Sequence, residues 1–219
     1  MNAYEVAAGI RNQPGDRLPA SIRDDLALNP KLLTQTDNTA MPIVHLLAMS
    51  GQLADVKQLL TVAVLETVWG PGWTVPHVAA QTRCLDAIVE QLANHEHLLY
   101  WGDESGNTPV HLAARNGTLY QLGKLLEDPS RLAQPNCLLQ TPVHIAALNS
   151  NLHQLVNFLT PELLAQKDIQ NQPAYKVAED RGEVFETNAV LKKMVRRAKI
   201  LSGSERRNLE DVFEEVFES

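Results

Sequence analysis

Apolar side chains recur along the middle of the chain with the spacing of an amphipathic helix. They stand at positions i, i+3, i+6 and i+7, so they share one helix face. The three clearest copies are Leu53, Val56, Leu59 and Leu60; Leu119, Leu122, Leu125 and Leu126; and Leu152, Leu155, Phe158 and Leu159. Looser copies begin at Leu85 and Val184. Because a single helix of this kind cannot bury its apolar face alone, the pattern predicts a series of helices that pack on one another.

A second motif precedes each of these segments and predicts another helix. Residues 106–114 read GNTPVHLAA, and residues 139–147 read LQTPVHIAA. The same frame gives GWTVPHVAA at 72–80 and looser versions that begin at Pro42 and Pro173. A Thr can cap the first turn of a helix, and a Pro is tolerated there because its missing N–H would have no partner. Each copy therefore predicts a pair of amphipathic helices.

The copies follow one another at a nearly constant period. Between His45, His77, His111, His144 and Lys176 the spacings are 32, 34, 33 and 32 residues. The period and the order of the residues together resemble the ankyrin repeat. The resemblance extends from Asp37 to Lys193. It implies an all-α ankyrin-repeat solenoid of about five helix-turn-helix repeats, with short hairpin fingers and helical caps.

The same resemblance divides the chain into a cap, a series of repeats and a tail. We expect an N-terminal helical cap at residues 1–36, with its helix between Pro19 and Leu33. The repeats are expected at residues 37–68, 69–102, 103–135, 136–167 and 168–200. Residues 203–219 combine an apolar stripe at helical spacing with an acidic face, which predicts an amphipathic C-terminal helix.

The outer repeats depart from the family pattern. Pro42 and Pro173 occupy the place of the Thr, and Lys176 replaces the His of the fifth repeat. Degenerate terminal repeats are expected in a solenoid, because its ends meet water rather than another repeat. We therefore expect the first and fifth repeats to serve partly as caps.

The hairpin turns depart from the family pattern as well. The turn Asp of the family is present as Asp37, Asp103 and Asp168, but the fourth and second repeats have Asn136 and Trp69. The Gly three residues later is retained only as Gly72 and Gly106, and the other repeats have Ala40, Leu139 and Asn171. Since Gly adopts left-handed backbone conformations more readily than other residues, we expect the three tips without it to be less regular.

Composition and charge restrict the classes of partner. The 219 residues carry a net charge of −7, which argues against attraction to nucleic acid or to anionic lipid. The sequence has no apolar run long enough to span a bilayer and no signal peptide at Met1, so we expect a soluble, cytoplasmic protein. Cys84 and Cys137 lie far apart in unlike contexts, so they predict no disulfide and no metal site.

The four repeat histidines invite a metal site, but the geometry of a solenoid argues against one. Packed helices lie about 8 to 10 Å apart, whereas ligands of one zinc ion lie within roughly 3.5 Å of each other. The resemblance implies a structural role instead, in which each His joins its turn to the neighbouring loop. His95 and His97 would not face each other on a helix, and we expect them in a solvated loop.

The sequence offers no candidate for catalysis. It contains no phosphate-binding loop, no HExxH motif, no nucleophile elbow and no paired Cys motif. Cys84 precedes a predicted helix, and without a positioned His and acid it is interpreted as an incidental side chain. We therefore assign no catalytic, cofactor-binding or metal-binding residue and expect no cofactor.

The resemblance implies a protein partner, because ankyrin repeats bind along a concave face made by hairpin tips and first helices. The corresponding residues at the tips are Trp69, Trp73, Trp101, Glu104, Asn107, Leu138 and Gln140, and those on the first helices are Gln81, Arg115, Asn116, Leu148 and Asn149. Trp is enriched at binding hot spots. We expect Trp73 to point outward in an aromatic patch formed by the second and third repeats. The alternative is that Trp69 and Trp101 fold under their own hairpins.

Two interpretations of the tail remain open. Residues 192–199 carry five basic residues, which suit either a nuclear-import tag or the end of a last helix, whose dipole attracts cations. The acidic residues 203–219 suit a C-terminal cap that packs on the fifth repeat. They also resemble the C-terminal signal of effectors that bacterial type IV secretion systems inject into host cells, and many of those effectors carry ankyrin repeats.

The function predicted from these features is protein binding. The chain would act as a monomeric adaptor, scaffold or inhibitor of a cellular or host protein, without membrane insertion or nucleic-acid binding. The alternative is an enzyme or an enzyme subunit with its site in residues 1–36 or 194–219. Those segments are shorter than the roughly 40 residues that a minimal independent domain needs.

Overall fold

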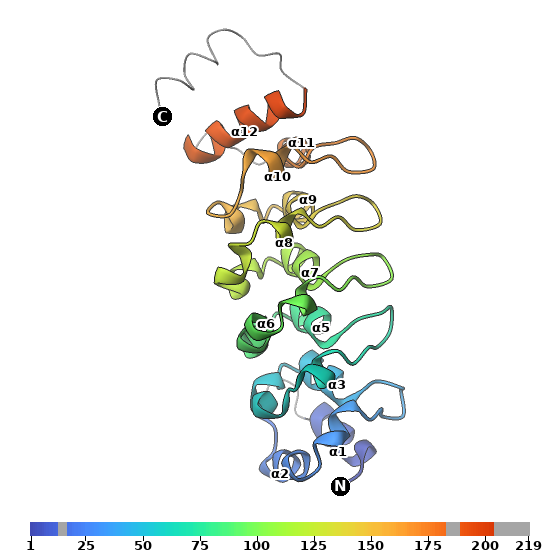
Figure 1. The fold of residues 1–219 in the computed structure, drawn as a ribbon. Helices are drawn as coiled ribbons and strands as arrows, with labels where there is room; N and C mark the ends of the chain where they lie inside the picture. Colours follow the sequence, from blue (N-terminus) through green and yellow to red (C-terminus); the bar gives the residue numbers. More distant parts are fainter. Residues whose placement is uncertain (13–16, 183–188, 204–219) are drawn as a thin grey trace.

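A computed structural model describes residues 1–12, 17–182 and 189–203 of the chain. Helical units are stacked into one elongated column, and the loops between them protrude from one side as hairpin fingers (Figure 1). Within the described ranges the hairpins contain isolated β-bridges but no strand. The predicted fold class, an all-α solenoid, is confirmed.

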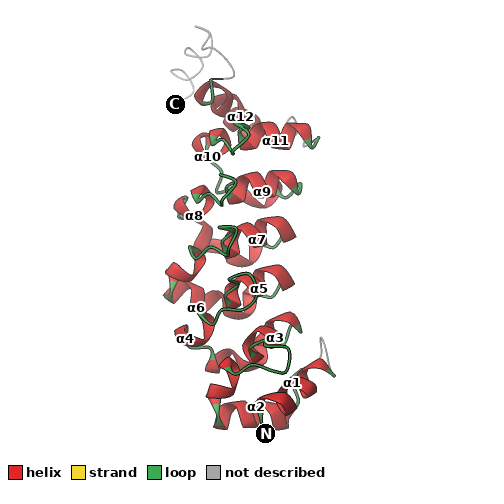
Figure 2. Cartoon of the chain, turned by 90° about the vertical axis from the view of Figure 1, so that its right-hand side faces the viewer, coloured by secondary structure: helices red, strands yellow, loops and turns green. Residues whose placement is uncertain are grey.

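Inner helices form the main column of the stack (Figure 2). They are α3 (Ile43–Met49), α5 (Val75–Thr82), α7 (Pro109–Asn116), α9 (Pro142–Leu148) and α11 (Ala174–Asp180), and each contacts the next. Thr74, Thr108 and Thr141 precede three of them in extended conformation and cap their first turns. The Thr-Pro motif therefore starts α7 and α9, and Thr74 starts α5 with its Pro one place later, as the sequence predicts.

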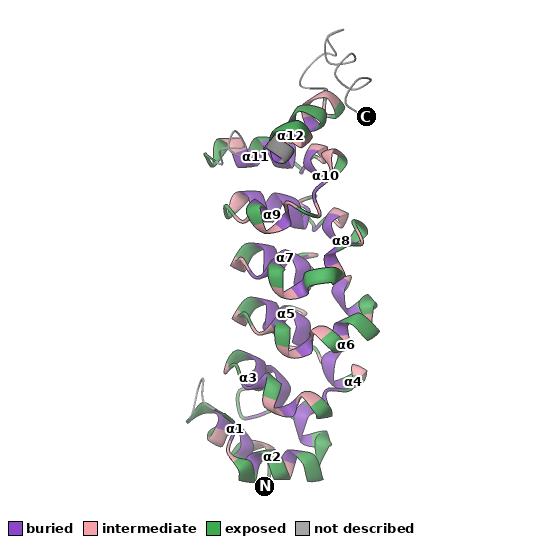
Figure 3. Cartoon of the chain, turned by 90° about the vertical axis from the view of Figure 1, so that its left-hand side faces the viewer, coloured by how far each residue is buried: buried purple, intermediate pink, exposed green. Residues whose placement is uncertain are grey.

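Small residues allow the inner helices to approach one another. Ala79, Ala113 and Ala146 are fully buried at equivalent positions of α5, α7 and α9. Buried residues mark every inner helix (Figure 3), and one continuous apolar cluster runs from Val6 to Ala198. The repeats thus share a core that no single repeat could form.

The second segments of the repeats differ from the prediction of α-helices. They are the 3-10 helices η2 (Leu53–Leu59), η3 (Leu85–Ile88), η5 (Leu119–Leu126) and η6 (Leu152–Leu155), and η3 continues into α6 (Val89–Asn94). The apolar spacing explains the difference, because residues at i, i+3 and i+6 align in a helix of three residues per turn. In η5, Gly123 has a φ of 48° and breaks the helix.

Each second segment is followed by a short helix that the sequence analysis does not predict. These helices are α4 (Val62–Leu65), η4 (Glu96–Leu99), α8 (Ser130–Ala133) and α10 (Pro161–Ala165). The α-helical members lie beside the inner column together with α6 (Figure 2). Each leads the chain into the next hairpin finger.

Additional helices cover both ends of the described stack. At the N-terminal end lie α1 (Ala3–Arg11), α2 (Ala20–Leu28) and η1 (Pro30–Thr34). The predicted cap helix corresponds to α2 and η1, whereas α1, which contacts α3, is not predicted. At the other end α12 (Ala189–Leu201) packs on α10. The predicted second segment that begins at Val184 starts in the gap between the described ranges and continues into α12, where its Leu191 is buried. The predicted acidic helix lies outside the described ranges from residue 204 onward.

Candidate binding surface

Four of the five hairpin fingers are closed by a side-chain oxygen that accepts two backbone hydrogen bonds, whereas the second, which has Trp69 at that place, is closed by the main-chain pair between Trp69 and Trp73. Oδ1 of Asp103 accepts from the N–H of Ser105 at 2.9 Å and from the N–H of Asn107 at 2.8 Å. Asp37, Asn136 and Asp168 accept in the same way from residues two and four positions later. Asn136 therefore replaces the turn Asp without a change of geometry, but it leaves the fourth finger without that negative charge.

The finger tips are regular in every repeat, and the expectation of irregular tips is wrong. Ala40, Leu139 and Asn171 have φ values of 59°, 56° and 61°, in the left-handed region that Gly72 and Gly106 also occupy. At Gly106 the next finger adds a steric constraint. A Cβ at Gly106 would lie 3.0 Å from the backbone N of Cys137.

Main-chain hydrogen bonds join the second to the fifth finger into one surface. The N–H groups of Glu104, Cys137 and Ile169 donate to the carbonyls of Pro71, Ser105 and Leu138, each at 3.0 Å. No such bond joins the first two fingers in the described part of the chain. The first finger is held instead by Arg11 of α1, which pairs with Asp37 and donates to Thr39 at 3.2 Å.

The repeat histidines connect neighbouring repeats, which confirms their predicted structural role. In His111, Nδ1 accepts the N–H of Thr108 at 3.1 Å, so the proton resides on Nε2, which donates to the carbonyl of Gln140 at 3.0 Å. His77 and His144 repeat this arrangement one repeat away on either side. His45 donates to the carbonyl of Trp73, but its Nδ1 is buried without a partner because Pro42 has no N–H.

Burial keeps these histidines neutral. It lowers the pKa of His45 and of His111 to about 4, mainly because a charged imidazole would lose its hydration there. Burial likewise lowers the pKa of His77 and of His144. Within the described residues, no group of three or more His, Cys, Asp or Glu side chains is arranged to hold a metal ion.

The three tryptophans do not form the expected aromatic patch, and Trp73 does not point outward. Trp73 is half-buried against the core, and its indole N–H donates to Oδ2 of Asp103 at 3.1 Å. Trp69 is also half-buried, pairs its backbone with that of Trp73, and lies with its ring centroid 6.1 Å from that of His45. These two tryptophans are therefore part of the joints between fingers one, two and three.

Trp101 alone among the tryptophans is exposed, with 41% of its surface accessible. Its ring meets the edge of the His97 ring at a centroid distance of 6.4 Å. His97 lies in the short helix η4 and pairs with Glu66 at 3.0 Å. His97 is exposed, as expected of a solvated position, but it lies in a short helix rather than in a loop, and its pair with Glu66 joins two repeats.

The other predicted contact residues differ in exposure. Gln81, Glu104, Arg115, Leu138 and Asn149 are exposed, whereas Asn116, Gln140 and Leu148 are half-buried. Asn107 is only 7% exposed, so its prediction as an open contact is wrong. Its side chain lies in the joint between two fingers, where Oδ1 accepts from Nδ2 of Asn136 at 2.9 Å. That burial follows from the approach of the fourth finger, which no local pattern reveals.

Two exposed apolar residues at the finger tips are missing from the sequence prediction. Leu139 is 50% exposed and Ile169 is 61% exposed, close to the predicted contact Leu138. The sequence pattern identifies Leu139 only as a substitute for the turn Gly. The sequence feature that could have identified Leu139 as an exposed tip residue is its apolar side chain at a turn position that adopts a left-handed conformation.

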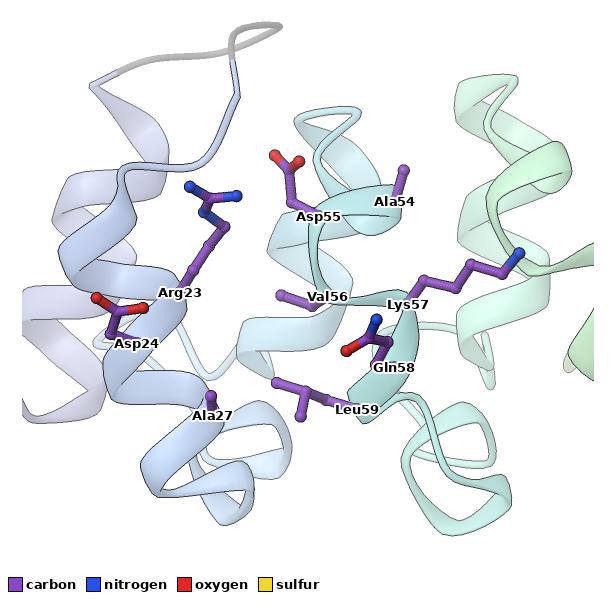
Figure 4. Close-up of a pocket in the computed structure, with 9 residues that line it drawn as sticks. All are labelled: Arg23, Asp24, Ala27, Ala54, Asp55, Val56, Lys57, Gln58 and Leu59. Atoms are coloured by element: carbon purple, nitrogen blue, oxygen red, sulfur yellow. The ribbon is translucent and has the colours of Figure 1, made fainter.

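The structure also contains two open hollows away from the fingers. One has a volume of about 530 Å³ and lies between α2 and η2. Arg23, Asp24 and Asp55 are among the residues that line it (Figure 4). The other has the same volume and is lined by Glu127, Pro129 and residues 157–160. The lining of the first hollow contains no Ser, Thr or Cys side chain. Among the helices that the structure describes, none is both long and apolar enough to cross a membrane.

Comparison with known proteins identifies the repeats. A family model described as ankyrin repeats, in three copies, matches residues 44–131. The chain contains ankyrin repeats. The finger turns and the His bridges extend the same ankyrin geometry beyond the match, through Asn136, His144 and Asp168. No curated protein matches the sequence. Ankyrin repeats indicate a protein-interaction module.

Proposed function

We propose that the chain binds a partner protein on its finger face. This surface consists of exposed side chains at the finger tips and at the ends of the inner helices: Gln81, Glu104, Arg115, Leu138, Leu139, Asn149 and Ile169. The observation that carries the proposal is the set of main-chain hydrogen bonds that join fingers two to five. A surface that is already ordered loses less conformational entropy when a partner binds, so more of the contact energy becomes affinity.

The proposed mode of action is binding without chemistry, as an adaptor, a scaffold or an inhibitor. On the finger face the charged side chains are Glu104 and Arg115, which lie on a finger tip and on α7. The four repeat histidines are buried, and each bonds to a carbonyl of the next repeat. This arrangement favours recognition over catalysis.

The proposal is tested by affinity capture from cells with the parent chain and with a double variant, Arg115→Ala with Leu138→Ser. Both side chains are exposed, so the variant should keep the melting temperature of the parent. We expect proteins captured by the parent to be lost from the variant. Tyr120→Ser is the matched control, because Tyr120 is exposed on η5, outside the finger face.

The outcome that contradicts this proposal is equal capture by the parent and the double variant. Loss of the same proteins from the Tyr120→Ser control would place the contact on η5 instead. If the melting temperature of the double variant falls, the two single variants are tested separately, and the unfolding curve of each shows whether loss of capture reflects loss of the fold.

A finer proposal, that the chain is an effector injected into a host cell, rests on the acidic sequence of residues 203–219 alone. A translocation reporter fused to residues 200–219 tests it in a strain with and without the secretion system. Transfer that depends on the system supports the proposal, and the absence of transfer removes it.

A further inference from the structure

The tips of the fourth and fifth fingers carry three exposed apolar side chains. Leu138, Leu139 and Ile169 are 52%, 50% and 61% exposed. The carbonyl of Leu138 accepts the N–H of Ile169 at 3.0 Å, so the two tips are adjacent and fixed relative to each other. We call these three residues the apolar tip patch.

Leu139 occupies a tip position where its side chain does not help the fold. Its φ of 56° is unfavourable for a residue with a Cβ, and the second and third fingers have Gly72 and Gly106 at the equivalent place. Half of the side chain remains exposed, so burial does not compensate for the strain. Ala40 and Asn171 adopt the same backbone at exposed tips of the first and fifth fingers, and Leu139 differs from them in presenting a large apolar side chain to solvent.

The apolar tip patch is also free of charge, although the whole chain carries a net charge of −7. Residues 136–140 and 168–172 contain a single ionisable carboxylate, Asp168. That carboxylate is 7% exposed and accepts the N–H groups of Gln170 and Gln172 at 2.9 and 3.0 Å. The exposed polar neighbours are the amides of Gln170 and Asn171. A partner contact that matches this surface is uncharged.

We propose that the apolar tip patch binds an uncharged segment of a partner protein through the segment's apolar side chains. This inference rests on the proposed function and adds the chemistry of the partner and the part of the finger face that it contacts. Leu138, Leu139 and Ile169 supply the buried apolar area, and the amides of Gln170 and Asn171 bond to the backbone of the segment. Because no ion pair contributes, the affinity is nearly independent of salt concentration.

The test selects ligands from a random peptide library displayed on phage, with the full chain as bait, at low and at high salt. We expect the selected peptides to be rich in apolar residues and poor in charged ones. A synthetic copy of a selected peptide is then titrated against the parent and the variants. Ile169→Ser should weaken its binding at least about tenfold, because full burial of an Ile side chain is worth that much affinity.

Leu139→Gly separates binding from folding. Gly suits the left-handed backbone of this tip, so the variant should be at least as stable as the parent while it binds the peptide more weakly. Tyr120→Ser, on the exposed side of η5, should leave the dissociation constant unchanged.

Three results overturn the inference: selection of charged peptides, an affinity that falls steeply with salt, or failure to obtain any peptide that Ile169→Ser weakens. In each case the proposed function survives if Arg115→Ala still abolishes partner capture, because Arg115 lies outside the apolar tip patch. If neither the capture nor the peptide titration depends on the finger face, the proposed function fails as well.

Discussion

At the scale of single residues, the same position in different repeats has different neighbours, and those neighbours decide its role. Thr108 supplies an N–H to Nδ1 of His111, whereas Pro42 cannot supply one to His45. The role of the histidines follows from the repeat pattern. The role of Trp73 does not, because the acceptor of its indole N–H is Asp103, which lies 30 positions later.

Replacement of Pro42 by Thr should stabilise the first repeat. The backbone at Pro42 is already extended, with φ −61° and ψ 142°, so Thr fits and its N–H can reach Nδ1 of His45. We expect the free energy of unfolding to rise by up to about 1 kcal/mol, the value of one buried hydrogen bond. Urea denaturation measures it. Thr108→Pro, the reverse exchange, removes the backbone N–H that donates to Nδ1 of His111 and should lower the same quantity, and a gain there would contradict the explanation.

Leu139→Gly should also raise the free energy of unfolding, by roughly 0.5 to 1 kcal/mol, because it removes left-handed strain from an exposed residue. Thermal unfolding followed by circular dichroism gives the change. The neighbouring substitution Leu138→Gly is the control. Leu138 is exposed to a similar degree but has no positive φ, so Gly there should destabilise. Equal effects at both positions would show that strain is not the cause.

At the scale of elements, side-chain amides connect one repeat to the next. Nδ2 of Asn151, just before η6, donates to the carbonyl of Ala114 in α7 at 2.9 Å. Gln154 donates in the same direction, to the carbonyl of Gly117 at 2.9 Å. These bonds satisfy carbonyls at the end of α7 that have no partner within the helix. The repeat pattern predicts the helices, but these connections depend on the packing distance between repeats.

Asn151→Ala should destabilise the solenoid by roughly 1 to 2 kcal/mol, because it leaves the carbonyl of Ala114 without its donor. Guanidinium denaturation measures the loss. Asn157→Ala is the matched control, since Asn157 is exposed and has no comparable bond among the described contacts. A similar loss in both variants would indicate an effect of side-chain removal in general.

The second segments of the repeats show how far a periodic pattern determines a helix. Their apolar positions predict correctly which residues face the core, and Leu119, Leu122 and Leu126 are buried. The type of helix is predicted wrongly, because the spacing i, i+3, i+6 suits a 3-10 helix as well as one face of an α-helix. Gly123 then prevents a continuous helix in that segment.

At the scale of the whole molecule, the buried histidines should make the stability of the solenoid dependent on pH. Their ordinary pKa is 6.5, and it is lowered to about 4 for His45 and His111 in the folded chain. As the pH falls below 6.5, the unfolded chain binds protons first. Stability is therefore complete above pH 6.5 and is lost progressively as the pH falls toward 4.

The loss should reach roughly 3 kcal/mol for His45 alone, since each pH unit between the two pKa values corresponds to about 1.4 kcal/mol. Urea denaturation at a series of pH values measures it. The lowered pKa of Asp37 adds a loss of the same sign at still lower pH. A profile that stays flat between pH 6.5 and 4 would contradict the burial argument.

The sequence by itself determined the repeat period, the starts of the inner helices and the residues that face the core. These features depend on interactions within a few residues, such as Thr capping and apolar spacing. The tertiary structure alone decided which tip residues remain available to a partner. Asn107 and Trp73 are enclosed by the next finger, whereas Leu139 and Ile169 stay exposed. The physical reason is that the exposure of a tip depends on a neighbouring finger some thirty residues away, and only the stacking of the repeats fixes that distance.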